Sequence, residues 1–379
     1  MSRYDIHHMY LCTQKQQISI HMTQELQYKI ESIINRNPQA DDKEIVFQLK
    51  HLLYETDLQR FTADKETKSI SDLVAENMRK LCEGTYPNDM IKSGFDDFDR
   101  QLGGFRLGEF IVIGGRPAMG KTQLLINLSL NISITRPLLY VTLDLSDFLL
   151  TNRFMASVFK IPVDSFLRNQ FNEEQIIKLS SADEDEFSKR QLFIHDGSCT
   201  VDEITAHCKK QIQENGIQVI VVDYLQLMKS YKLRNREQEV SYISRELKNL
   251  AKEYNVCVIA SSQVNRSVDY RTGMEGKHPQ LSDLRESGAI EQDADKVIFI
   301  YRPEYDKIFE DADGNSLINL VKIIVLKNRN GRLGDFNLLR DDNFTNFFTN
   351  FENFTKHKNE FSFLPDRLLE LEDKEEMPF

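Results

Sequence analysis

The sequence predicts an α/β domain with a mainly parallel central sheet, and three observations indicate it. Six short runs of mostly apolar residues recur along the chain, as expected of strands that are buried on both faces. Helical periodicity separates several of these runs, most clearly over Glu237–Tyr254. A glycine-rich turn joins the first run to a helical pattern, as parallel α/β sheets require. The predicted strands are Phe110–Ile113, Leu138–Leu143, Val219–Val222, Val256–Ala260, Val297–Tyr301 and Leu320–Leu326.

Composition and charge restrict the class of protein. Of 379 residues, 40% are hydrophobic and 28% are charged, which is typical of a soluble globular chain. No apolar run reaches the length of a membrane span, and the five cysteines lack disulfide or zinc spacing, which favours a reducing cytoplasm. The net charge of −11 argues against a broad basic surface that coats DNA. It leaves open a narrow path where a few local donors contact phosphates.

Four regions follow from changes in pattern along the chain. Residues 1–65 are predicted to form a small helical N-terminal region, and 66–92 to contain a linker helix over Ser69–Leu81. That helix carries apolar side chains on one side, so docking on a neighbour and packing on its own domain both remain open. Residues 93–342 are predicted to form the α/β domain. Residues 343–379 are rich in Phe and then in Asp and Glu, which indicates a disordered acidic tail.

The turn after the first predicted strand is a phosphate-binding loop. It fits the pattern G-x-x-x-x-G-K-[ST] at each fixed position, between a strand and a helix. Such a turn points backbone N–H groups and the positive end of a helix at phosphates. Lys121 would reach the β- and γ-phosphates and Thr122 would ligate Mg²⁺, so we expect ATP or GTP to bind. The predicted nucleotide-binding residues are Gly115, Arg116, Pro117, Ala118, Met119, Gly120, Lys121 and Thr122.

Three further polar residues follow predicted strands. Asp223 ends an apolar strand, where its carboxylate would hold Mg²⁺ through water opposite Thr122. Asp144 follows Leu138–Leu143 and would orient the attacking water if that strand lies beside the phosphate-loop strand. Gln263 follows Val256–Ala260 and would contact the γ-phosphate and report its loss to the next loop. A solvated loop amide is the alternative interpretation of Gln263.

Several longer blocks occur together in a characteristic order and spacing. With them, the chain resembles the ATPase domain of DnaB-type replicative helicases, which is a RecA-like P-loop ATPase. The resemblance covers about 93–342, and the blocks around Asp223 and Asp295 are more specific than the phosphate loop alone. The blocks are Ser93–Asp99 with Leu102–Gly104, Arg116–Thr122, Val222–Met228, Ser262–Ser267, Ser282–Asp295 and Lys327–Gly331.

The resemblance implies a ring, usually of six subunits, with ATP and Mg²⁺ at the subunit interfaces. It implies that Lys327 and Arg329 reach the neighbour's site as trans-acting cations, which would neutralise charge on the transferring phosphoryl group. It also implies a channel loop where Arg285, Glu286 and Gly288 contact single-stranded DNA independently of base sequence. Movement in the 5′→3′ direction is likewise an implication of the resemblance.

The chain departs from the pattern of this family at two points. The family usually has Glu where this chain has Asp144, and a side chain that is one methylene shorter predicts slow hydrolysis. The N-terminal region is shorter than the primase-docking domain that such helicases carry. Separately, the acidic residues of the tail followed by Met377–Phe379 resemble the tip of bacterial single-strand-binding proteins and predict a contact with replication partners. An ordinary solubilising tail is the alternative interpretation.

Three functions are compatible with these residues. The leading prediction is an ATP-dependent, ring-forming helicase that translocates on single-stranded DNA in DNA replication. The second is a RecA-like DNA-binding ATPase that loads or remodels other proteins without processive unwinding. The third is a non-catalytic assembly module that uses the nucleotide to hold a ring. Stimulation by single-stranded DNA separates the first two from the third.

Overall fold

The computed structural model describes residues 32, 67–85, 90–180, 185–197, 199–231, 233, 235–264, 271, 276, 278–284 and 288–349. Almost all of the predicted N-terminal region 1–65, the predicted DNA-contacting residues Arg285 and Glu286, and the tail after Thr349 lie outside them. The chain divides into two compact units, Met1–Pro87 and Asn88–Phe379.

In the first unit, the described residues form helix α4 (Ile70–Cys82), which coincides with the predicted linker helix. Ser69 caps it, since its side chain accepts a hydrogen bond of 3.1 Å from the backbone N–H of Asp72. The apolar side chains of α4 include Val74 and Met78, which are 52% and 58% exposed.

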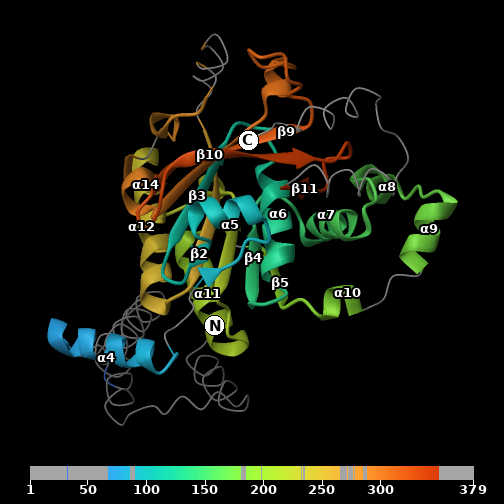
Figure 1. The fold of residues 1–379 in the computed structure, drawn as a ribbon. Helices are drawn as coiled ribbons and strands as arrows, with labels where there is room; N and C mark the ends of the chain where they lie inside the picture. The colour runs from blue at the N-terminus through green and yellow to red at the C-terminus, as the bar shows by residue number, and fades with distance from the viewer. Residues whose placement is uncertain are drawn as a thin grey trace. The chain divides into compact units, whose positions relative to one another are not determined.

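The second unit is built on one sheet of nine strands among the described residues (Figure 1). Six strands are parallel, in the order β8-β3-β7-β6-β4-β5, and three antiparallel strands extend the sheet beyond β8. The parallel strands are β3 (Phe110–Gly115), β4 (Leu138–Thr142), β5 (Leu192–Asp196), β6 (Val219–Asp223), β7 (Cys257–Gln263) and β8 (Lys296–Tyr301). The added strands are β9 (Leu320–Asn328), β10 (Gly334–Arg340) and β11 (Phe347–Phe348).

Helices cover both faces of this sheet and form two cores. Alternate residues of β3 face opposite ways, so Ile111 packs with α6 in one core and Val112 with α12 in the other. The first core includes α5 (Asp96–Leu102), α6 (Lys121–Ile132) and α7 (Asp147–Phe159), and the second includes α11 (Val201–Asn215), α12 (Arg236–Tyr254) and α14 (Gly288–Asp293). No helix in the described part of the chain is both long and apolar enough to cross a bilayer.

Short elements complete the described fold. A separate antiparallel pair joins β1 (Met90–Ile91) to β2 (Phe105–Arg106). The remaining helices are α8 (Val163–Arg168), α9 (Glu173–Ser180), α10 (Asp185–Ser188) and the 3₁₀ helices η1 (Leu225–Leu227), η3 (Leu281–Asp283) and η4 (Pro303–Asp306).

The six predicted strands are confirmed, but their order differs from one expectation. The sequence places Asp144 beside the phosphate loop only if β4 neighbours β3, and β4 instead lies between β6 and β5. Two strands therefore separate it from β3. Strand order depends on pairing between distant segments, which local apolar patterns do not encode.

The folded domain also extends beyond residue 342, where the predicted tail begins. Strand β11 pairs antiparallel with β10, and Phe347 is 5% exposed. The side-chain oxygen of Asn127 on α6 accepts a 2.9 Å hydrogen bond from the backbone N–H of Phe347. This short strand has no predictive pattern of its own, because its apolar residues resemble those of the tail that follows.

Candidate functional site

The phosphate loop lies between the end of β3 and the start of α6, as predicted. Gly120 has φ of 98° and Ala118 has φ of 63°, so the backbone turns through the left-handed region twice. A Cβ on Gly120 would lie 2.4 Å from the Phe344 ring, and a Cβ on Gly115 would lie 2.7 Å from the Ile300 side chain. Both fixed glycines are therefore required by conformation or by packing.

Lys121 is folded over this loop. Its Nζ donates to the backbone oxygens of Gly115 at 2.8 Å and Arg116 at 2.9 Å, and the residue is only 8% exposed. Burial lowers the pKa of the ammonium to about 8, while the charge of Asp223 acts in the opposite direction. These contacts hold the ammonium against the backbone of the loop.

Asp223 lies at the end of β6 with its carboxylate fixed from both sides. The residue is 5% exposed; Oδ2 accepts from Tyr140 Oη at 3.1 Å, and Oδ1 accepts from Ser261 Oγ. Burial and then the charge of Asp223 raise the pKa of Tyr140 well above its usual value, so this phenol remains a donor. Strands β4 and β7, on either side of β6, supply these two hydroxyls.

The oxygen ligands at this edge fit Mg²⁺. A Thr122 hydroxyl and an Asp223 carboxylate are hard donors of the kind that Mg²⁺ prefers, with its other positions kept by water and phosphate. Within the described residues, no group of three or more His, Cys, Asp or Glu side chains is placed to hold a metal.

Asp144 and Gln263 lie at the same edge of the sheet. The register places Gly115 opposite Gln263 and Thr142 opposite Asp223, so the carboxyl ends of four strands meet there. Burial, then the charges of Asp144 and Asp223, raises the pKa of the intervening Tyr224. The carboxylates of Asp144 and Asp223 therefore both act on Tyr224, although β4 is not adjacent to β3. Asp144 itself is exposed.

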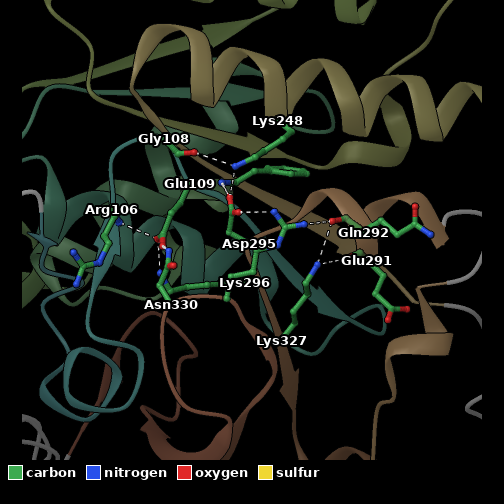
Figure 2. Close-up of polar contacts among 12 residues, drawn as sticks. Arg106, Gly108, Glu109, Lys248, Glu291, Gln292, Asp295, Lys296, Lys327 and Asn330 are labelled. Atoms are coloured by element: carbon green, nitrogen blue, oxygen red, sulfur yellow. Dashed lines mark hydrogen bonds and ion pairs between the residues drawn. The ribbon is translucent and has the colours of Figure 1, made fainter. Parts of the chain in front are cut away.

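Lys327 and Arg329 lie at the other end of the parallel strands, because Lys327 pairs with Val297 at the start of β8. Figure 2 shows Lys327 beside Glu291 and Gln292. The backbone N–H of Arg329 donates to the backbone carbonyl of Asp295 at 2.9 Å. The backbone N–H of Asp295 donates to the carbonyl of Phe110, the first residue of β3, at 2.7 Å. Five residues of extended strand separate Phe110 from Gly115, which is about 17 Å. One chain therefore does not bring these cations to its own phosphate loop.

The comparisons with known proteins bear directly on this arrangement. The family model of the DnaB-like helicase C-terminal domain matches residues 90–350. The chain belongs to this family. A solved ATPase domain superposes on this DnaB-like domain with a TM-score of 0.67 and 32% identity, over 75% of this chain and 100% of that one. The predicted family and fold class are thus confirmed.

Full-length relatives are longer than this chain. The replicative DNA helicase DnaB of Buchnera aphidicola subsp. Baizongia pistaciae (strain Bp) is 34% identical over 310 residues, which are 80% of this chain and 64% of that protein. The DnaB of Geobacillus stearothermophilus is 38% identical over 253 residues, 65% of this chain and 54% of its own length. A DnaB-like replicative helicase, described with its interactions with primase, has a TM-score of 0.69 and 29% identity over 85% of this chain and 76% of its own. The chain spans less than two thirds of the length of these two DnaB sequences.

Several residues at the phosphate loop of this DnaB-like domain have no counterpart among the predicted site residues. Arg302 Nη1 donates to the Ala118 carbonyl at 3.0 Å, and its guanidinium lies 4.4 Å from the centre of the Phe344 ring. Glu304 holds both Arg302 and Arg340 through Oε1, the latter at 2.7 Å. Arg302 precedes η4, Glu304 lies in it, Arg340 ends β10 and Phe344 lies in the turn after β10, all far along the chain from the loop. No local sequence pattern marks them, and Phe344 falls within the predicted tail.

Gln226 is a second residue without an assigned role in the sequence. Its side-chain amide donates to the Gln263 carbonyl at 3.1 Å and accepts from the Gln263 backbone N–H at 3.0 Å. It thereby fixes the backbone at the end of β7. Its place in the block Val222–Met228 is the one signal that the sequence offers for it.

Of the three residues predicted to contact DNA, Gly288 is the one that the structure describes. Gly288 is the first residue of α14, and nothing lies within 4 Å of where its Cβ would be. Arg285 and Glu286 lie outside the described residues. The DNA-contacting role of all three stays a prediction.

Proposed function

We propose that the protein hydrolyses ATP at the interfaces of a ring of its own copies and uses the reaction to translocate on single-stranded DNA as a replicative helicase. The observation that carries this proposal is the separation of Lys327 and Arg329 from the phosphate loop by the length of β3. A head-to-tail arrangement, in which one copy's cations meet the next copy's loop, closes into a ring when the rotation permits. Six copies, 5′→3′ movement and a cytoplasmic location belong to the same proposal.

The residues divide the work of phosphoryl transfer. Lys121 and the loop N–H groups bind the phosphates, while Asp144 orients the attacking water and accepts its proton. Lys327 and Arg329 of the next copy stabilise charge on the transferring group. Thr122 and Asp223 would hold Mg²⁺, which would neutralise negative charge on the phosphates. Gln263 would contact the γ-phosphate.

Nucleic acid and protein partners form a further part of the proposal. Arg285, Glu286 and Gly288 would contact the phosphates of single-stranded DNA, so affinity depends on salt more than on base sequence. The tip Met377–Phe379, which follows acidic residues, is proposed to contact replication partners. One of the similar structures is described with primase, which supports a partner of this class.

A second function is favoured by Asp144, whose shorter carboxylate suits a slower ATPase that loads or remodels other proteins. Two measurements separate the alternatives: ATP turnover with and without single-stranded DNA, and strand displacement on a forked duplex. Stimulated turnover with displacement supports the helicase, and stimulated turnover alone supports the remodeller. Turnover that does not respond to DNA would overturn both.

Asp144→Glu is expected to raise ATP turnover. The longer side chain moves the carboxylate by about 1 Å toward the water, and a displacement of that size is worth up to about a hundredfold in rate. Steady-state phosphate release measures it. Asp164→Glu, a change at an exposed acid that pairs with Arg168, is the matched control. Slower turnover in Asp144→Glu would mean that the site is built around Asp.

The affinity for ATP is expected to fall above about pH 8. The protonated Lys121 binds the phosphates, and its pKa of about 8 makes affinity constant below that pH and weaker as pH rises through it. Binding at pH 9 should be about tenfold weaker than at pH 7. Titration with a fluorescent ATP analogue measures this, and Lys121→Met should bind weakly without the step. An identical pH profile in both proteins would contradict the assignment.

A further inference from the structure

Asp295 connects the two candidate cations to the rest of the domain. It follows α14 and precedes β8, and the residue is only 6% exposed. Its Oδ1 accepts from Arg329 Nη1 at 3.2 Å. Its Oδ2 accepts from Lys248 Nζ at 2.6 Å and from the Phe110 N–H at 2.8 Å. Figure 2 shows this carboxylate between α12, the start of β3 and the end of β9.

The carboxyl end of α14 supplies the remaining contacts. Arg329 Nη2 donates to the Gln292 carbonyl, and Lys327 Nζ donates to the Gln292 carbonyl at 3.2 Å and to that of Glu291. The last carbonyls of a helix lack partners within the helix and attract cations. Together, the Asp295 carboxylate and the two carbonyls form a cradle that holds both cations in their own chain.

The cradle restrains a side chain that is otherwise free to move. Arg329 is 47% exposed at its side chain, and ordering such a long side chain costs rotamer entropy. Its guanidinium has five N–H donors, and its contacts to Asp295 and Gln292 occupy two. The guanidinium therefore keeps N–H donors for a phosphate while its contacts fix its orientation. Because the side chain is already ordered, less entropy is lost when it binds the phosphate.

We propose that Asp295 is a positioning residue for Arg329: its carboxylate holds the guanidinium in the orientation from which it acts on the neighbouring copy's nucleotide. The inference rests on the proposed trans-acting role of Arg329. The competing interpretation is structural, because Asp295 also ties Phe110 to Lys248 and hence supports its own phosphate-loop strand. If Asp295 positions Arg329, its replacement lowers hydrolysis at the loop of the neighbouring copy. If Asp295 is structural, its replacement impairs the loop of its own copy.

The test uses Asp295→Asn in the full chain, with ATP turnover measured alone and in mixed assemblies. Alone, the variant should lose about 10- to 100-fold in kcat, as expected of a misplaced catalytic group, with the Kd for a fluorescent ATP analogue within about twofold of wild type. Mixing with Lys121→Ala should restore turnover several-fold. The Lys121→Ala copies have no functional loop but bring an intact Asp295 and Arg329 to the loops of their neighbours.

Two further variants separate the possible failures. Arg329→Ala mixed with Lys121→Ala tests the trans-acting role itself, and Asp295→Asn added to Arg329→Ala should cause no further loss in kcat. If the Arg329→Ala mixture recovers and the Asp295→Asn mixture does not, Asp295 is structural and this inference fails alone. If neither mixture recovers, the trans-acting role fails with it. Loss of ATP binding in Asp295→Asn would also overturn the inference.

Asp293→Asn is the matched control. Asp293 ends α14, is 7% exposed and pairs with Arg245 at 3.1 Å. It resembles Asp295 in chemistry and burial. Turnover should therefore persist in this variant. A loss equal to that of Asp295→Asn, rescued equally by Lys121→Ala, would overturn the specific role of Asp295.

Discussion

Replacing Arg329 by alanine is expected to lower kcat for ATP about a thousandfold while changing the Kd for ATP by less than about twofold. The guanidinium would act on the neighbour's γ-phosphate only as charge develops in the transition state, so binding in the ground state is largely independent of it. In its own chain Arg329 contacts Asp295 and Gln292, far from the phosphate loop. Turnover and equilibrium binding of an ATP analogue together measure the two effects.

Arg332→Ala serves as the control for this prediction. Arg332 is an exposed basic residue three positions further along the chain, so its removal changes the net charge equally. It should leave kcat within about twofold, as for a surface substitution away from a site. Equal losses of affinity and rate in Arg329→Ala would contradict an action confined to the transition state. An unchanged kcat would contradict the trans-acting role of Arg329 altogether.

Replacing Glu109 by alanine is expected to lower the free energy of unfolding by about 3–5 kcal/mol, because it leaves a buried ammonium without its counter-charge. Lys296, on β8, is 1% exposed, and its Nζ contacts Glu109 Oε2 (Figure 2). Glu109 also accepts from Asn330 Nδ2 at 2.9 Å and from the Arg106 N–H at 3.0 Å. The change therefore leaves the buried Lys296 ammonium without its acceptor, and it also removes the acceptor for Arg106 and Asn330, which are exposed residues. Chemical denaturation followed by circular dichroism measures it.

Two comparisons make this result specific. The double variant Glu109→Leu with Lys296→Met removes both charges and should recover most of the loss, since apolar pairs replace buried ion pairs well. Asp164→Ala breaks an exposed pair whose side chains are 64% and 67% accessible, and should cost less than about 1 kcal/mol. A Glu109→Ala variant as stable as Asp164→Ala would show that water reaches Lys296.

Local sequence pattern by itself determined much of this protein. It predicts the phosphate loop, five of the six parallel strands and Asp223 at a strand end. A strand–turn–helix is a local unit, and the burial of each of these strands follows from its own residues. The blocks shared with DnaB-type helicases supply Lys327 and Arg329 as candidates. Strand β5 escapes prediction because it is half-buried at the edge of the sheet, so its apolar pattern is weaker.

The tertiary structure alone decided which distant residues and strands lie next to one another. Asp295 bonds to Phe110 across 185 positions of sequence, and Phe344 reaches Gly120 from a segment with the composition of a tail. The tertiary structure also set the order of the strands, with β7 and β6 between β3 and β4. It placed the phosphate loop at one end of β3 and the two cations at the other. Periodicity reports which face of each segment is buried, whereas pairing between distant segments depends on the packing of the whole chain.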